Sequence, residues 1–145
     1  MHLNEVLRRT IEQGSITPGP DRTTQEIFPI AIPAQEGEAL QRWVEREHAV
    51  RTIEIGLAFG ISTLFVCAGP LTNGDEAALH VALDPNQLTG FASAGLKLLE
   101  TAGVRDLVEF HDERSEIALP RFLPPARMAR ADEGHTLVRH HRGDM

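Results

Sequence analysis

The spacing of apolar side chains predicts two helices in the first third of the chain. Leu3, Leu7 and Ile11 recur at intervals of four positions, which is typical of an amphipathic helix over residues 3–13. Apolar residues return at helical spacing over residues 36–48. We therefore expect two helices, packed near the start of whatever strand follows them.

The segment between these helices is rich in proline and glycine. Pro18, Gly19 and Pro20 predict a loop, because these residues disfavour regular structure. Residues 27–33 are apolar but contain Pro29. Since proline is confined to edges and irregular positions of sheets, we expect extended chain that lies over a core and not a central strand.

From residue 51 onward, short β-branched or apolar runs alternate with longer helical segments. The runs that predict strands are 51–55, 80–83 and 107–111. The segments that predict helices are 61–69, 87–102 and 114–123. Such alternation is typical of a parallel sheet with right-handed crossovers. The predicted fold class is therefore α/β, a partial Rossmann-like doubly wound sheet whose first three strands lie in the order third, second, first, with helices on both faces.

The pattern is lost after Leu123. Residues 124–145 begin with two prolines, and their only apolar doublet is Leu137-Val138. We therefore predict a disordered C-terminal tail, because so little apolar surface cannot offset the entropy of ordering. The expected organisation is an N-terminal helical and extended cap over residues 1–50, an α/β half-domain over 51–123, and the tail over 124–145.

Composition narrows the classes of partner. A length of 145 residues fits one domain, and a net charge of −7 argues against a nucleic-acid surface, which needs clustered basic residues. No apolar run approaches the roughly 20 residues of a membrane span. A single cysteine and no signal peptide predict a cytoplasmic protein.

Two groups that often carry chemistry have simpler explanations here. Cys67 lies in the most apolar predicted helix, which favours an inert core residue. His135, His140 and His141 could bind a metal, but they lie in the predicted tail without cysteines. We therefore expect no metal site.

The loop after the first predicted strand has the context of a ligand-binding turn, because it follows a strand and opens a helix. Gly56 permits a sharp turn and Gly60 permits close packing of the helix start, where free N–H groups attract an anion. Glu54 adds a carboxylate at the strand end. No lysine follows Gly60 and no third glycine is present, which argues against a P-loop and a dinucleotide loop. A ligand with an amino-acid end fits better than a diphosphate.

Polar side chains also follow the second and third predicted strands. Asp84 can accept hydrogen bonds from ribose hydroxyls, and His111, Asp112 and Ser115 could border an adenine. Because parallel sheets bind ligands at the carboxyl ends of their strands, these groups should converge at one edge. Alternatives stay open: Asp84 can simply end a strand, His111 can be a packed residue, and Ser115 can begin a helix.

Residues 51–64 (RTIEIGLAFGISTL) resemble the first motif of class I S-adenosylmethionine-dependent methyltransferases, particularly the O-methyltransferase-like group. Residues 80–85 and 108–120 resemble the second and third motifs. The resemblance implies S-adenosylmethionine as cofactor, with Glu54 holding the methionine amine and Asp84 the ribose. It leaves the catalytic residues unassigned. The other cofactor-binding positions that it implies are Gly56, Ala58, Gly60, Ser62 and Thr63 around the methionine and ribose, and Asp112 and Ser115 near the adenine.

The chain departs from this family after Leu123. The family sheet has seven strands, and the expected fourth strand, an apolar run ending in Asp, does not follow. The expectation is a truncated or frameshifted cofactor-binding portion, inactive alone, whose full-length relative would methylate an oxygen or similar nucleophile of a small-molecule substrate. One edge of residues 52–55 would then lack a partner and favour self-association.

Two other functions remain alternatives at this stage. One is a non-catalytic α/β fragment without a ligand. The other is an NAD-type nucleotide binder, which the missing third glycine disfavours.

Overall fold

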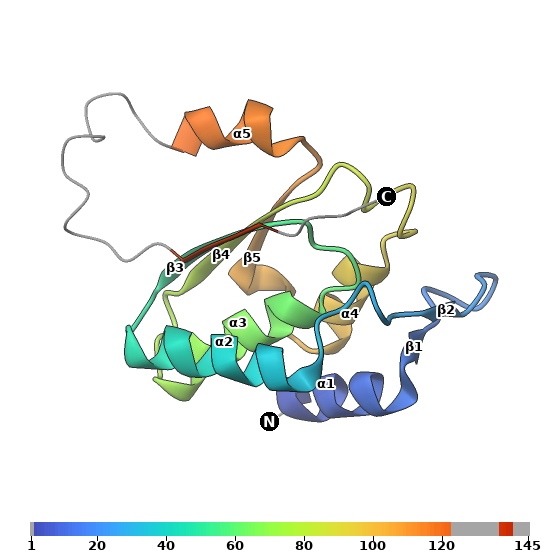
Figure 1. The fold of residues 1–145 in the computed structure, drawn as a ribbon, viewed down its shortest axis with the longest axis horizontal. Coiled ribbons are helices and arrows are strands. Elements are labelled where there is room, and N and C mark those ends of the chain that lie inside the picture. The colour runs from blue at the N-terminus through green and yellow to red at the C-terminus, as the bar shows by residue number, and fades with distance from the viewer. Residues whose placement is uncertain (1, 123–136, 141–145) are drawn as a thin grey trace.

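A computed structural model describes residues 2–122 and 137–140 as a parallel sheet between two unequal layers of helices (Figure 1). Among the helices of the described residues, α5 lies on one face of the sheet, here called the upper face, and the others lie on the lower face. The helices are α1 (His2–Gln13), α2 (Ala34–Arg46), α3 (Ile61–Thr72), α4 (Ala94–Thr101) and α5 (Ser115–Phe122), with a short 3-10 helix at Arg105–Leu107. Helices on both faces confirm this part of the predicted fold.

The sheet has the strand order β5-β4-β3-β6, and every neighbouring pair is parallel. Its strands are β3 (Arg51–Ile55), β4 (Leu79–Leu83), β5 (Val108–His111) and β6 (Leu137–His140). In register, Ile53 lies opposite Val81 on one side and Val138 on the other. The predicted order of the first three sheet strands, third, second, first, is therefore confirmed.

Strand β6 corrects the prediction for the end of the chain. Leu137–His140 form a strand where we expected only a disordered tail, and they pair with β3 from Thr52 to Ile55. The edge of β3 is thus not open, and the premise for self-association through it is wrong. The apolar doublet gives little local signal, since a strand is stabilised by its long-range partner. His135 and His141 lie outside the described residues.

Two further predictions need correction, the start of one helix and the conformation of one connecting segment. The helix expected from residue 87 begins at Ala94, after turns over residues 85–93. The segment 27–33 is turned and not extended, with the Ala31 N–H bonded to the Ile27 carbonyl, although it does lie over the core. The loop between α1 and α2 contains a small antiparallel hairpin, β1 (Ser15–Ile16) with β2 (Gln25–Glu26).

The two faces of the sheet differ in polarity and in burial. On the lower face, Thr52, Glu54 and His80 are buried beneath the helices. On the upper face, Ile53 and Val81 are only partly buried. The main hydrophobic core therefore lies between the lower face and helices α1, α3 and α4.

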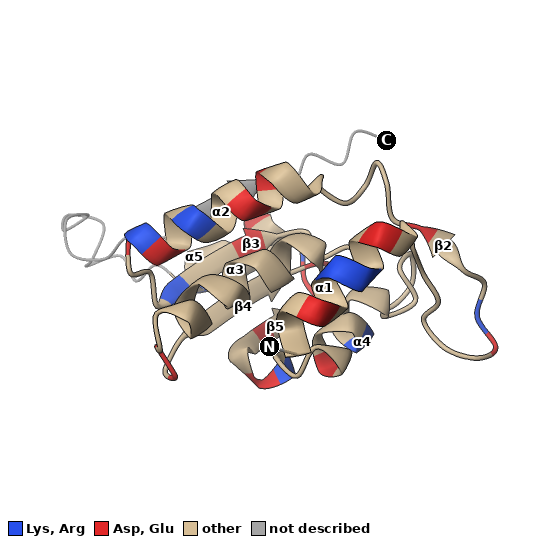
Figure 2. Ribbon diagram, turned by 90° about the horizontal axis from the view of Figure 1, so that it is seen from below, with Lys and Arg blue, Asp and Glu red and all other residues tan. Residues whose placement is uncertain are grey.

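Helix α2 packs closely on α3 because small residues lie at their contact. A Cβ on Gly37 would lie 2.1 Å from the Phe65 ring, and one on Gly69 would lie 2.6 Å from Val44. Acidic and basic residues are interspersed along α1 and α2 (Figure 2). Within residues 2–122 and 137–140, no helix is long and apolar enough to cross a membrane.

Candidate functional site

The loop between β3 and α3 is a tight turn that leads directly into the first turn of the helix. Gly56 and Gly60 have φ angles of 91° and 82°, in the left-handed region that favours glycine. The first helical hydrogen bond of α3 runs from the Leu64 N–H to the Gly60 carbonyl. The N–H groups of residues 61–63 precede that bond, so they have no partner within the helix. They lie at the positive end of the helix dipole, and Ser62, which is partly exposed, is the residue of the three that a carboxylate can reach.

Ala58 is held in an unusual conformation at the centre of this loop. Its φ angle is 47°, which is uncommon for a residue with a Cβ. Its N–H donates to Asp84 Oδ2 at 2.9 Å, and its carbonyl accepts from Gln87 Nε2 at 2.8 Å. These two bonds tie the loop after β3 to the loop after β4.

Asp84 combines this structural contact with access to a cavity. Its Oδ1 accepts the Asn86 N–H at 2.8 Å, and the residue is only 3% exposed. A carboxylate offers about four acceptor positions, so the two amides of Ala58 and Asn86 leave others available. Asp84 can therefore brace the loops and still accept hydroxyl groups from a ligand.

A cavity of about 270 Å³ opens at the carboxyl ends of β3 and β4 and reaches the start of α5. This is where open parallel sheets bind ligands, and the volume is close to the lower end of the usual range for ligand pockets. Phe91 forms part of its wall and makes an edge-to-face contact with Phe59 at 5.1 Å. The full lining is Ile55, Gly56, Ala58, Leu83, Asp84, Pro85, Asn86, Phe91, Arg114, Ser115 and Glu116.

The structure brings part of the predicted cofactor set together at this cavity. Gly56, Ala58, Asp84 and Ser115 line it, from three different loops. The remaining predicted positions are not part of its wall. These are Glu54, Gly60, Ser62, Thr63 and Asp112.

The positions away from the cavity have distinct surroundings. Ser62 borders a smaller space of about 10 Å³ against residues 30–32. Gly60 packs against α4, and a Cβ added to Gly60 would lie 3.2 Å from the Gly95 carbonyl oxygen. Thr63 is fully buried, whereas Asp112 is exposed. Their proposed contacts with a cofactor stay predictions.

Glu54 is buried beneath the loop and is surrounded by donors. Its Oε1 accepts the Ser62 hydroxyl, and its Oε2 accepts the Thr63 hydroxyl at 2.8 Å. His80 Nε2 lies 3.2 Å from the same Oε2. Burial alone would raise the pKa of Glu54, but the bond and charge of His80 and the two hydroxyls hold that pKa below its ordinary value. Glu54 is therefore an ionised carboxylate inside the protein.

The surroundings of His111 are those of a packed residue, and those of Cys67 are those of an inert core residue. The His111 ring lies 2.6 Å from Glu109 and stacks edge-to-face on Phe122, and His111 is not in the cavity wall. Cys67 is buried, which raises the pKa of its thiol to about 12 and keeps it protonated, with the Glu54 charge adding to the effect. In the described part of the chain, no group of His, Cys, Asp or Glu residues could hold a metal ion.

Sequence reasoning missed the most connected residue of the site. Gln87 is completely buried, and its Oε1 accepts the Gly95 N–H at 2.8 Å while its amide holds the Ala58 carbonyl. Gln87 was not singled out because it lies in a segment whose residue spacing predicted a helix. Its position three residues after Asp84, in a loop that turns toward the next helix, was the one available signal. The cavity residues Asn86, Phe91, Arg114 and Glu116 were also missed.

Comparisons with known proteins give one matching family and a consistent fold. A family model described as a methyltransferase domain matches residues 53–143. No curated protein matches the chain in sequence.

Several solved structures share the fold. The O-methyltransferase TomG from Streptomyces achromogenes, involved in tomaymycin synthesis and solved with SAM, matches with a TM-score of 0.60 and 24% identity, over 86% of this chain and 48% of its own. An O-methyltransferase from Bacillus cereus, solved with SAH, matches with a TM-score of 0.59 and 21% identity, over 83% and 47%. SAH-bound PaMTH1 from Podospora anserina gives 0.59 and 19%, over 85% and 45%. The chain thus spans about half the length of these proteins.

Proposed function

Because the chain belongs to the methyltransferase domain family, we propose that it binds S-adenosylmethionine in the cavity at the carboxyl ends of β3 and β4. The reaction that this binding serves is methyl transfer to an oxygen or similar nucleophile of a small molecule. Solved proteins of the same fold include O-methyltransferases in complex with SAM and SAH, which supports the proposal.

One observation carries this proposal: Gly56 and Ala58, from the loop that leads into α3, line the cavity together with Asp84, a buried acid that follows the neighbouring strand. The partly exposed Ser62 at the start of α3, outside the cavity wall, offers a backbone N–H that suits the carboxylate of the methionine moiety. Asp84, in the cavity wall, suits the ribose hydroxyls.

The apolar part of the cavity wall suits the remaining portion of the ligand. Leu83 and Phe91 offer apolar surface near Asp84, and Ser115 lies across the cavity at the start of α5. An adenine ring needs this combination of flat apolar contact and edge hydrogen bonds. When bound, S-adenosylmethionine supplies an electrophilic methyl group on a sulfonium, and the chain's own residues hold and orient it.

We further propose that this chain alone binds the cofactor but does not complete methyl transfer. The chain covers 48% of TomG and 47% of the Bacillus cereus enzyme. The described lining of the cavity comes from the loops after β3 and β4 and from the start of α5.

The alternative of an NAD-type binder is disfavoured by the loop itself. Between Gly56 and Gly60 the loop carries Ala58 in the cavity wall, and it lacks the third glycine of a dinucleotide loop. The buried negative charge of Glu54 beneath the loop also opposes a diphosphate.

Calorimetric titration of the full chain with S-adenosylmethionine, S-adenosylhomocysteine and NAD⁺ tests the proposal. We expect one site for each of the first two ligands and no binding of NAD⁺. Incubation with S-adenosylmethionine and a panel of phenols should form no S-adenosylhomocysteine above the background without protein. Binding of NAD⁺ in preference to S-adenosylmethionine would refute the assignment, and enzymatic turnover would refute the claim of inactivity.

A further inference from the structure

The buried polar side chains of the lower face form a continuous network under the candidate cofactor loop. Thr52, Glu54 and His80 come from the neighbouring strands β3 and β4 and are at most 6% exposed. His80 Nδ1 lies 2.8 Å from Thr52 Oγ1, and His80 Nε2 lies 3.2 Å from Glu54 Oε2. The imidazole is therefore held at both of its nitrogens.

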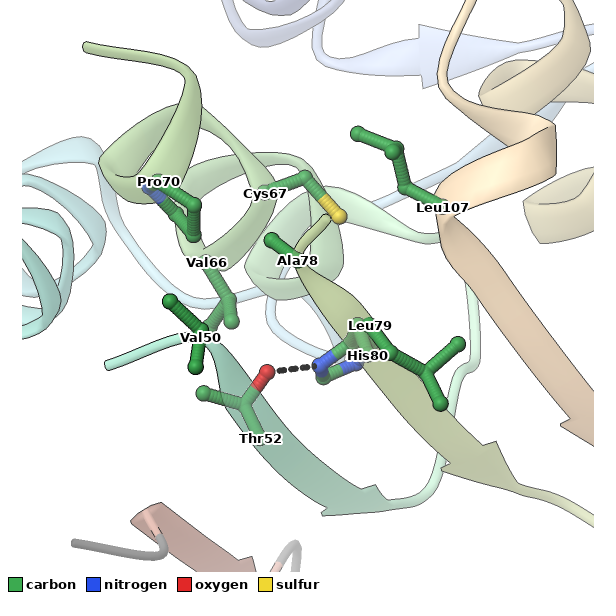
Figure 3. Close-up of a pocket in the computed structure, with 9 residues that line it drawn as sticks. All are labelled: Val50, Thr52, Val66, Cys67, Pro70, Ala78, Leu79, His80 and Leu107. Atoms are coloured by element: carbon green, nitrogen blue, oxygen red, sulfur yellow. Dashed lines mark hydrogen bonds between the residues drawn. The ribbon is translucent and has the colours of Figure 1, made fainter. Parts of the chain in front are cut away.

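The space beside His80 offers little water as a substitute partner. Figure 3 shows Thr52 and His80 directed toward each other, with Val66 and Cys67 of α3 above them. The cavity that these side chains line has a volume of about 10 Å³. Since that is room for about one water molecule, the imidazole depends on Thr52 and Glu54 for its hydrogen bonds.

Glu54 extends this network to the ligand-binding end of α3. Its carboxylate accepts the hydroxyl groups of Ser62 and Thr63, which lie in the first turn of the helix. Of the residues in this turn, Ser62 is partly exposed, whereas Ile61 and Thr63 are buried, so a ligand can reach the Ser62 N–H. The position of this donor is therefore set by Glu54, and the position of Glu54 is set in part by His80.

We propose that His80 is a positioning residue for S-adenosylmethionine, acting through Glu54 on the first turn of α3. The inference rests on the proposed function, because it names a residue that supports the same site. It assigns Glu54 an indirect role, since the Ser62, Thr63 and His80 donors occupy its carboxylate. A direct contact of Glu54 with the methionine amine, which the sequence resemblance implied, is the competing assignment.

The sharpest variant is Thr63→Val, which removes a hydroxyl and keeps the shape of the side chain. Thr63 is completely buried, so it cannot touch a ligand in this structure. If the network positions the helix start, Thr63→Val should weaken cofactor binding about threefold to thirtyfold, the range of effects transmitted through packed networks. Calorimetric titration with S-adenosylmethionine measures the change.

Two substitutions of His80 test whether a conservative replacement restores the cofactor affinity that a disruptive one loses. His80→Leu removes both hydrogen bonds and should weaken binding at least as much as Thr63→Val. His80→Gln retains an amide N–H that can reach Glu54, so it should recover most of the affinity that His80→Leu loses. In a Thr63→Val background, the effect of His80→Leu on affinity should shrink, because both changes interrupt the same path.

Val44→Ala is the matched control for general destabilisation. Val44 is buried in a separate cluster with Ala49 and Val66, and it has no part in the network. Thermal unfolding should show a loss of stability in this variant without a loss of cofactor affinity at temperatures where it is folded. If His80→Leu does not fold, Thr63→Val and His80→Gln decide the question.

The wild-type titration separates the two proposals. If the wild-type chain does not bind S-adenosylmethionine, the proposed function fails and the positioning role fails with it. If the wild-type chain binds but Thr63→Val and His80→Leu bind equally well, only the positioning role is overturned. The same conclusion follows if the effects of His80 and Thr63 on affinity are fully additive.

Discussion

On the lower face of the sheet polar side chains are buried, whereas on the upper face apolar side chains are partly exposed. Thr52, Glu54 and His80 are buried beneath α3 and bonded to one another. Ile53 and Val81, which point the other way, are only partly covered. Alternation of polar and apolar residues usually predicts the opposite arrangement.

The difference shows what decides which face of the sheet becomes the interior. Cover by helices and the supply of hydrogen-bond partners decide it, and not the polarity of the side chains alone. Helix α3 offers Ser62 and Thr63 to the lower face, so a carboxylate can be buried there with every oxygen bonded. On the upper face, α5 is the helix that the described residues provide (Figure 1). Parallel sheets are normally covered on both faces, and the described residues cover this face less completely than the lower one.

The largest expected effect is on the lower face. Glu54→Ala leaves the buried His80 and Thr63 and the partly exposed Ser62 without their acceptor, and breaking a buried pair in this way costs about 3–5 kcal/mol. We expect urea unfolding to show a loss of stability of that order, with His80→Gln costing clearly less. A loss below about 1 kcal/mol would mean that water replaces the carboxylate, and the lower face would not be a closed network.

The next largest effect is expected at the carboxyl edge, where the two faces meet. Asp84→Ala removes the proposed ribose acceptor, and loss of hydrogen bonds to a charged group should weaken S-adenosylmethionine binding about tenfold to a hundredfold. Asp106→Ala is the control, because Asp106 is exposed, lies in the 3-10 helix before β5 and is not part of the cavity wall. Equal affinities of Asp84→Ala and the wild-type chain would remove Asp84 from the site.

Acid should affect the lower face selectively. The pKa of Glu54 is lowered from 4.5 in the folded protein, so its contribution to stability is present above pH 4.5 and is lost as the pH falls through the lower folded value. Glu54→Gln cannot titrate, so its free energy of unfolding should depend less on pH below 4.5 than that of the wild-type chain. Parallel curves for the two proteins would contradict an ionised Glu54.

The smallest effect is expected on the upper face. Ile53→Thr replaces a partly buried apolar side chain, and we expect a loss of about 1 kcal/mol or less in the free energy of unfolding. Leu64→Ala on α3 is the buried comparison and should cost about 2–5 kcal/mol. Similar losses for the two substitutions would show that the upper face is as well covered as the lower one.

Strands β3, β4 and β5 and their order in the sheet could be predicted because each of them has a local signal in the sequence. The β-branched run at 51–55 coincides with β3, and Gly56 and Gly60 do adopt left-handed conformations. Asp84 follows β4 and lines the cavity, as the strand-end rule indicates.

The features that could not be predicted depend on contacts between residues that are far apart in the sequence. Gln87 lies in a segment with helical spacing, yet its side chain bonds the backbone of Gly95 and the turn continues to Ala94. Strand β6 has only a short apolar doublet and depends on β3 for its pairing. The bond between His80 and Glu54 joins residues 26 positions apart, and no periodicity in the sequence indicates it.

Nuclear magnetic resonance of the isotopically labelled chain during titration with S-adenosylmethionine tests the central claim most directly. We expect saturable shifts of the backbone amides at residues 56–63 and 84–86, with little change on α1 and α2, which lie away from the cavity. Shifts confined to other surfaces, or none at ligand concentrations in the millimolar range, would contradict the account.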